Sequence, residues 1–172
     1  MSTVIYRDAV ATDAAALAAF SASSFVDTFG PLYPPADLAA YLGGKYTPER
    51  QAAEIADSAT HYRLALHGAQ IVGYCKAGAL GLPVEPRGAA IELHRLYVDA
   101  SVKGAGVAQT LMDEALAWAR ARGATEMYLS VWENNQRAQA FYRRYGFEQV
   151  GEWEFMVGSV ADRDLIMRLE LT

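Results

Sequence analysis

The fold is decided by residues 91–109, which read Ile-Glu-Leu-His-Arg-Leu-Tyr-Val-Asp-Ala-Ser-Val-Lys-Gly-Ala-Gly-Val-Ala-Gln. The β-rich run 90–98 predicts a strand, and the glycines within 103–108 predict a tight turn into an amphipathic helix from about Gly106 to Arg122. A second strand is predicted over 127–131. Strand, helix and strand in this order predict a right-handed crossover that joins two parallel strands.

The segments on both sides of this unit predict further strands and helices. Hairpin signals on each side suggest antiparallel additions, so the fold class is α/β (α+β), a mixed, mostly antiparallel sheet covered by helices. The expected strands are 4–7, 62–67, 71–76, 147–157 and 164–169. The expected helices are about 13–25, a short helix from Pro35 that stops at Gly43-Gly44, a third starting at Thr47-Pro48, and 136–145.

Length and composition favour one acidic globular domain over residues 1–172. Hydrophobic residues make up 52% of the chain, enough for a core, and the net charge of −5 argues against a nucleic-acid partner. No apolar run is long enough for a membrane span, and the single cysteine, Cys75, falls in a predicted strand as a core residue. His61, His67 and His94 are too far apart for a local metal motif. We therefore expect a cytoplasmic protein without a metal.

The glycine turn at 103–108 is suited to an anion. Its glycines let the backbone approach a ligand, and the free N–H groups at the helix start favour phosphate. A dinucleotide fingerprint would need glycine at Gln109, and a P-loop would need Gly-Lys-Ser/Thr, which does not follow. Taken alone, the turn is equally consistent with a ligand-free connection.

Two segments together resemble the GNAT superfamily of N-acetyltransferases. Lys103-Gly104-Ala105-Gly106-Val107-Ala108 is similar to the family's acetyl-CoA pyrophosphate loop at Gly106 and Ala108, with Lys103 where Arg or Gln is commoner. Residues 135–147 look like the family's Asn-x-x-Ala-x-x-x-Tyr…Gly-Phe segment. The resemblance covers about residues 62–170, the acetyl-CoA-binding core, and leaves 1–60 as the variable acceptor-side helices. It implies six or seven strands with a splayed parallel pair and four or five helices.

The resemblance implies direct transfer of an acetyl group from acetyl-CoA to a primary amine. Tyr142 would be the general acid, with a core aromatic as the alternative reading. Asn135 would hold the pantetheine arm, although it also suits a helix N-cap. The main chain near Leu96, Tyr97 and Val98 would polarise the thioester carbonyl. The phosphates would meet Lys103, Gly104, Ala105, Gly106, Val107 and Ala108. Arg137, Arg143 and Arg144 are further candidates, although each of them alone is more typical of a solvated surface arginine.

Two titratable residues on the strand 90–98 are candidates for the base. Strict alternation places Glu92, His94, Leu96 and Val98 on one face, and Ile91, Leu93, Arg95 and Tyr97 on the other. An imidazole titrates nearest to neutral pH, whereas Glu92 would need a water relay or a raised pKa. Glu92 alternatively orients His94 or binds a cationic acceptor. Both residues can also be ordinary polar side chains.

The acceptor is predicted from a narrower resemblance. The stretches 92–98, 131–135 and 164–168 are similar to a bacterial subgroup that includes polyamine (spermidine/spermine) acetyltransferases. An acidic site would draw on Asp27, Asp37, Glu92 and Glu133, and its walls on Phe25, Phe29, Tyr33, Tyr41 and Trp132. The alternatives are a protein or peptide N-terminal acetyltransferase, and a CoA-binding regulatory module with little turnover. The family habit also implies a homodimer.

Overall fold

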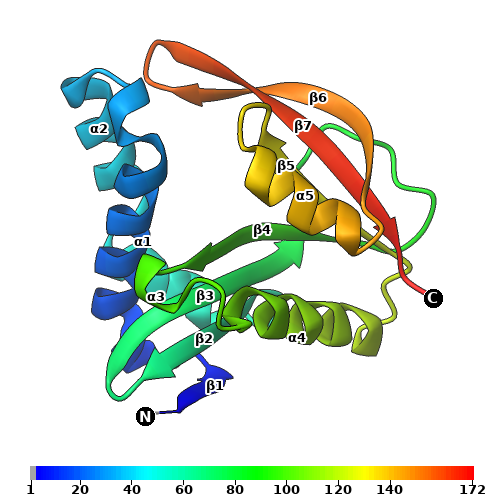
Figure 1. Ribbon diagram of the computed structural model, residues 1–172, viewed down its shortest axis with the longest axis horizontal. Helices are drawn as coiled ribbons and strands as arrows, with labels where there is room; N and C mark the ends of the chain where they lie inside the picture. Colours follow the sequence, from blue (N-terminus) through cyan, green and yellow to red (C-terminus); the bar gives the residue numbers. More distant parts are fainter. Residues whose placement is uncertain (1–2) are drawn as a thin grey trace.

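Residues 3–172, the part of the chain that the computed structural model describes, form a seven-stranded sheet with helices on both faces (Figure 1). The strand order is β1-β2-β3-β4-β5-β7-β6. The strands are β1 (Val4–Asp8), β2 (His61–His67), β3 (Gln70–Ala79), β4 (Ala90–Val98), β5 (Glu126–Trp132), β6 (Glu148–Val157) and β7 (Val160–Glu170). The helices are α1 (Ala14–Phe29), α2 (Pro35–Lys45), α3 (Pro48–Ala56), α4 (Val107–Ala121) and α5 (Gln136–Arg144). The predicted mixed sheet is confirmed.

The parallel pair β4–β5 is joined only at its beginning. Residues 90–92 pair with 126–128, whereas β5 pairs with β7 along its whole length, 126–132. All other neighbouring strands run antiparallel. Beyond residue 92, β4 and β5 diverge and leave an opening in the middle of the sheet, as Figure 1 shows. The predicted splay is therefore present.

Different helices cover the two faces of the sheet. On one face, α4 and α5 pack over a core that includes Leu111, Leu129 and Met167. On the other face, α1 packs on β2–β4 through a smaller cluster that includes Leu17 and Tyr74. Burial of these apolar side chains supplies most of the drive for folding. No helix within residues 3–172 has the length and apolar character needed to cross a membrane.

A β-bulge at His94 divides β4 into two parts. Lys76 pairs with Arg95, but the next residue of β3 pairs with Leu93, so His94 is an extra residue without a partner on β3. The expected strict alternation is therefore wrong beyond His94. Ile91, Leu93, Leu96 and Val98 pack towards α4, whereas Arg95 and Tyr97 share the α1 face with Glu92 and His94.

The helix ends differ from expectation in two places. α1 continues to Phe29, and α2 continues through Gly43 and Gly44 to Lys45, so the predicted stops were wrong. A glycine lowers the stability of a helix by about 1 kcal/mol relative to alanine. Gly43 and Gly44 are exposed and lie in the last turn, where the helix tolerates this loss. The predicted start of α3 is confirmed, because the Thr47 hydroxyl accepts a hydrogen bond from the Arg50 N–H at 3.2 Å.

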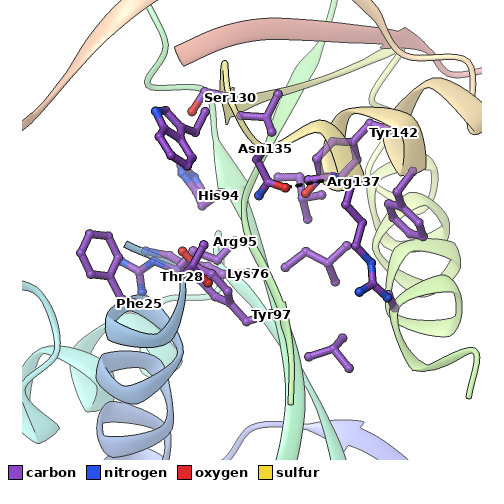
Figure 2. A pocket seen from close by; sticks show the side chains of 18 of the residues that line it. Phe25, Thr28, Lys76, His94, Arg95, Tyr97, Ser130, Asn135, Arg137 and Tyr142 are labelled. Atoms are coloured by element: carbon purple, nitrogen blue, oxygen red, sulfur yellow. Dashed lines mark hydrogen bonds between the residues drawn. The ribbon is translucent and has the colours of Figure 1, made fainter. Parts of the chain in front are cut away.

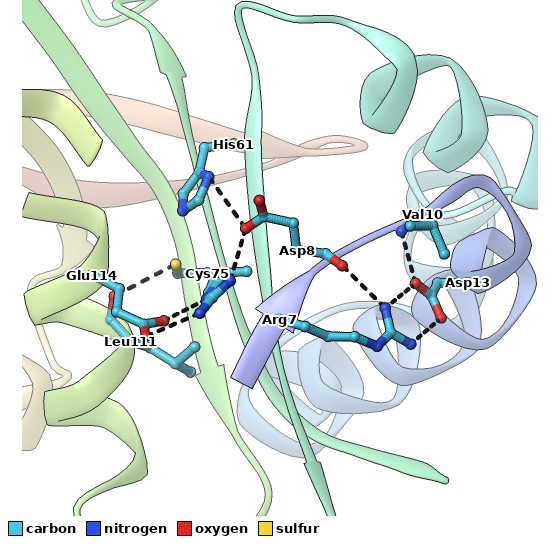
Figure 3. Close-up of polar contacts among 9 residues, drawn as sticks. Arg7, Asp8, Val10, Asp13, His61, Cys75, Leu111 and Glu114 are labelled. Atoms are coloured by element: carbon cyan, nitrogen blue, oxygen red, sulfur yellow. Dashed lines mark hydrogen bonds and ion pairs between the residues drawn. The ribbon is translucent and has the colours of Figure 1, made fainter. Parts of the chain in front are cut away.

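Ion pairs and a thiol tie the first strands to α4 (Figure 3). The Arg63 guanidinium donates to Glu114 at 2.6 Å and to Asp8 at 3.1 Å. Cys75 is fully buried, its thiol lies 3.6 Å from the Leu111 carbonyl oxygen, and burial raises its pKa to about 12. The predicted core role of Cys75 is confirmed, since a thiol with such a pKa stays protonated and unreactive at neutral pH.

Candidate active site

A cavity of about 860 Å³ occupies the opening between β4 and β5. Side chains from both faces of the sheet line it, and they form two walls that we name by their helices. The α4/α5 wall includes Leu96, Val98, Lys103, Gly104, Gly106, Val107, Ala108, Asn135, Arg137, Tyr142 and Arg144. The α1 wall consists of Phe25, Thr28, Phe29, Tyr33, Tyr41, Lys45, Tyr46, Lys76, Glu92, His94, Arg95, Tyr97, Ser130, Trp132, Trp153, Phe155, Asp162 and Asp164. Figure 2 shows Arg95 beside Phe25 and Thr28 of α1, with Tyr142 across the cavity on α5.

The glycine turn of the α4/α5 wall presents open backbone at the start of α4. Gly104 and Gly106 have φ angles of 84° and 80°, which favour glycine, and an added Cβ would meet nothing within 4 Å. The first N–H groups of α4 have no partner inside the helix, so the turn fits an anion such as a phosphate. Ala105 is not among the residues that line the cavity, and its N–H donates to the Val102 carbonyl at 3.2 Å; its predicted contact with the phosphates stays a prediction.

The first turn of α5 supplies polar groups to the same wall. The Asn135 side-chain oxygen accepts a hydrogen bond from the Ala138 N–H at 3.1 Å, so the residue is the N-cap of α5 and also lines the cavity. Arg137 and Arg144 line the cavity as well. Arg143 does not, since it donates to the Gln139 side chain instead.

Tyr142 combines an aromatic packing role with a place at the cavity. Its ring is half-buried and meets Phe141 and Phe147 edge-on, with ring centroids 5.6 and 5.9 Å away. Within residues 3–172, no hydrogen bond engages its hydroxyl, and burial raises its pKa to about 12. The phenol is therefore protonated at neutral pH and has a proton to donate.

Glu92 and His94 contact each other on the α1 wall. The Glu92 Oε1 lies 3.2 Å from the His94 Nδ1, and its Oε2 accepts a hydrogen bond from the Gly81 N–H at 2.8 Å. Burial raises the pKa of Glu92, but the hydrogen bonds from His94, Gly81 and Leu82 outweigh this effect, so the net pKa is lowered. A carboxylate on Nδ1 leaves Nε2 of a neutral imidazole as the proton acceptor.

The acidic residues of the α1 wall are mostly not those that the sequence suggested. Asp37 binds Ser159, Glu133 pairs with Arg163, and Asp27 is exposed; none of the three lines the cavity. Their places are taken by Asp162 and Asp164, which the sequence interpretation missed. Their spacing of two within a β-strand is the available signal, because it places both carboxylates on one face. The predicted aromatic residues all line the cavity.

Asp164 is the more buried of these two carboxylates. It is 8% exposed, and burial raises its pKa to about 6, although a hydrogen bond with Ser130 acts in the opposite direction. Asp162 accepts a hydrogen bond from the Tyr33 hydroxyl and adds negative charge nearby. Together with Glu92, these residues give one part of the α1 wall an affinity for a cation.

Three cations line another part of the α1 wall. The Arg95 guanidinium lies over the Tyr46 ring, 4.7 Å from its centroid, and Lys76 forms an ion pair with Glu54 at 2.9 Å. Burial, with Arg95 nearby, lowers the pKa of both Lys45 and Lys76. The sequence interpretation did not find this cluster, because it placed Arg95 on the opposite face of β4 and the lysines lie far away in the chain.

Known proteins resemble this chain over most of its length. Residues 24–147 match the model of the acetyltransferase (GNAT) family. An uncharacterized N-acetyltransferase of Mycobacterium tuberculosis is 34% identical over 160 residues, which cover 93% of this chain and 99% of the relative. The N-alpha-acetyltransferase RimI of the same organism is 36% identical over 100 residues, covering 57% and 58%. The crystal structure of PaiA N-acetyltransferase from Thermoplasma acidophilum in complex with coenzyme A has the same fold, with a TM-score of 0.80 at 22% identity, covering 98% and 99%.

Proposed function

This chain belongs to the GNAT acetyltransferase family and is an acyl-CoA-dependent acyltransferase, and we propose that it acetylates the primary amine of a small acceptor held by the α1 wall. One observation carries this proposal: a single cavity passes through the opened sheet, with a protonated tyrosine on one wall and carboxylates with a histidine on the other. Donor and acceptor can therefore meet from opposite faces of the sheet.

The α4/α5 wall fits the acetyl donor. When bound, acetyl-CoA supplies the acetyl thioester. The glycine turn, with Lys103 and Arg137, would hold its phosphates, because main-chain N–H groups and cations converge there. Asn135 would contact the pantetheine arm only through groups that its capping hydrogen bond leaves available. Main-chain groups of β4 beyond residue 92 have no partner strand on the β5 side within residues 3–172, which supports a role in polarising the thioester carbonyl.

The α1 wall would prepare the amine. A buried carboxylate such as Asp164 would attract the ammonium form and orient it. The amine must lose a proton before or during attack, and the His94 Nε2, with Nδ1 held by Glu92, is suited to take it directly or through water. Glu92 then acts mainly as a positioning residue.

Tyr142 would complete the transfer. The new C–N bond forms as the C–S bond breaks, the amine proton passes to the base, and the Tyr142 proton passes to the departing sulfur. A phenol with a pKa of about 12 is protonated throughout the neutral range, so it can serve as this acid.

Two classes of acceptor fit parts of the α1 wall. The predicted polyamine suits the acidic residues Glu92, Asp162 and Asp164, but the cations of the α1 wall disfavour a molecule with several ammonium groups. A peptide N-terminus is the second candidate, and the similarity to RimI supports it.

Thiol release from acetyl-CoA, measured with polyamines, amino acids, short peptides and simple amines, tests the proposal. We expect at least one amine to stimulate release and to yield its N-acetyl product. Tight acetyl-CoA binding without stimulated release would favour the regulatory module instead.

The pH–rate profiles of His94→Gln and Glu92→Gln identify the base. We expect His94→Gln to lose the acidic limb of the profile and Glu92→Gln to shift it. An unchanged acidic limb in both variants would place the base elsewhere.

A further inference from the structure

We infer that the acceptor carries a carboxylate as well as the amine, and that Arg95, supported by Lys45, binds this carboxylate on the α1 wall. The inference rests on the proposed function and adds the chemical class of the acceptor: a zwitterionic molecule such as a short peptide or an ω-amino acid.

Arg95 is a cation without a counter-ion. No carboxylate oxygen within residues 3–172 lies within 4.0 Å of its guanidinium, and its Nη1 is buried without a hydrogen-bond partner. The Tyr46 ring lies over the guanidinium, 4.7 Å from ring centroid to guanidinium carbon, and Arg95 lines the cavity. A buried arginine is costly unless it is paired, and its planar N–H groups match a carboxylate.

The residues around Arg95 leave an excess of positive charge. Lys45, Lys76 and Arg95 line the same part of the cavity, and the nearby carboxylate is Glu54. Glu54 is already engaged by Lys76 at 2.9 Å, by Arg50 at 3.2 Å and by the Tyr62 hydroxyl. Lys45 and Arg95 therefore remain unneutralised, and an anion entering the cavity would balance them.

The position of this charge separates it from the phosphates of acetyl-CoA. Arg95 and Lys76 lie on the α1 wall, whereas Lys103 and the glycine turn lie on the α4/α5 wall; Figure 2 shows Lys76 and Arg95 on the side of α1, across the cavity from Arg137. The anion that Arg95 fits is therefore part of the acceptor.

The acidic and basic parts of the α1 wall define the acceptor's two ends. Glu92 pairs with Gly78 and Arg95 with Lys76, two positions apart on β3, so the bulge leaves the two residues roughly 7 Å apart along the strand at about 3.3 Å per residue. An amine near Glu92 and Asp164 and a carboxylate near Arg95 must then be separated by several bonds. Glycylglycine and 6-aminohexanoate meet this requirement.

Matched pairs of acceptors test the inference. Glycylglycine is compared with glycylglycinamide, and 6-aminohexanoate with hexylamine, by thiol release and detection of the N-acetyl product. We expect kcat/KM to be at least about tenfold higher for each carboxylate-bearing member. In Arg95→Gln, this ratio should fall towards one, and Arg95→Lys should retain part of it.

Further variants distinguish recognition from a loss of structure. Lys45→Gln changes a half-buried residue at the end of α2 and should lower the same ratio by a smaller factor. Arg120→Gln, at an exposed position of α4, is the matched control and should leave the ratio unchanged. Circular dichroism and acetyl-CoA titration report whether each variant is folded and binds the donor.

Three results would overturn the inference. Equal or higher kcat/KM for the members that lack a carboxylate, or for spermidine, would exclude a carboxylate-bearing acceptor. A loss of acetyl-CoA affinity in Arg95→Gln equal to its loss of kcat/KM would assign the cation to the donor. No stimulated thiol release with any amine would refute the proposed function itself, and this inference with it.

Discussion

The two walls of the cavity are built in different ways. Apart from Leu96 and Val98 of β4, the α4/α5 wall comes from two continuous segments, 103–108 and 135–144, which contain the starts of α4 and α5. The α1 wall collects side chains from α1, α2 and five strands, β3 to β7, and it contains charges of both signs. A wall made of local backbone geometry suits a constant ligand, whereas a wall of dispersed side chains can change specificity without changing the fold.

The sharpest test of the α4/α5 wall is Tyr142→Phe. Removing the hydroxyl takes away the proposed proton donor but keeps the ring packing against Phe141 and Phe147. We expect kcat to fall about 100-fold or more, with acetyl-CoA affinity within about twofold of the original. Steady-state thiol release and calorimetric titration measure the two quantities.

Tyr145→Phe is the matched control for this variant. The Tyr145 hydroxyl donates to Asp113 at 2.8 Å, and the residue does not line the cavity, so kcat should change little. Equal losses in both variants, or full turnover in Tyr142→Phe, would remove Tyr142 from the mechanism.

The α1 wall is tested by Asp164→Asn. Because the pKa of Asp164 is about 6, acceptor binding through its charged form should weaken as the pH falls below 6. We expect the variant to lose about tenfold to 100-fold in kcat/KM for the acceptor at pH 7.5 and to lack this limb of the pH profile. An identical pH profile in the variant would contradict the role of Asp164.

The same variant should be more stable than the natural chain at neutral pH. The folded state raises the pKa of Asp164 from 3.8 to about 6, so ionisation destabilises the fold as the pH rises through this range, and the full cost is present above about pH 6. Asparagine avoids that cost. We expect a gain of about 1–2 kcal/mol in the free energy of unfolding at pH 7.5 and none near pH 3, measured by urea denaturation.

The sequence predicted the α4/α5 wall far better than the α1 wall. Gly106, Asn135 and Tyr142 lie in short motifs whose local geometry follows from turns and helix caps. Asp164 and Arg95 reach the cavity through strand order and a bulge, which depend on contacts distant in the chain. The strands and helices were predictable from periodicity. The predicted homodimer stays a prediction, because contacts within one chain do not test it.

Gly106→Ala tests how much the α4/α5 wall depends on backbone conformation. At a φ of 80°, an alanine costs about 1–2 kcal/mol, although space for its methyl group is available. We expect a comparable loss in the free energy of unfolding and a KM for acetyl-CoA raised about tenfold, with the preference among acceptors unchanged. An unaltered KM together with the loss of stability would show that the turn is structural only.

The smallest effect is expected for Gly43→Ala, outside both walls. Gly43 is exposed near the end of α2, and an added Cβ would meet nothing within 4 Å. Alanine should raise the free energy of unfolding by about 0.5–1 kcal/mol without changing kinetic constants. A thermal melt and a thiol-release assay check this, and destabilisation would show that the end of α2 is not regular helix in solution.

The bulge at His94 reverses the alternation of side chains along β4. Residues before and after it follow opposite alternation frames, so Arg95 and Tyr97 reach one ligand wall while Leu96 and Val98 reach the other. Leu93 and Arg95 pair with consecutive residues of β3, so deleting His94 would restore a regular ladder in which Arg95 and Tyr97 keep one wall and Leu96 and Val98 keep the other. In directed evolution or loop grafting on this scaffold, the bulge is therefore the place in β4 where a one-residue deletion is absorbed while the flanking side chains stay on their walls.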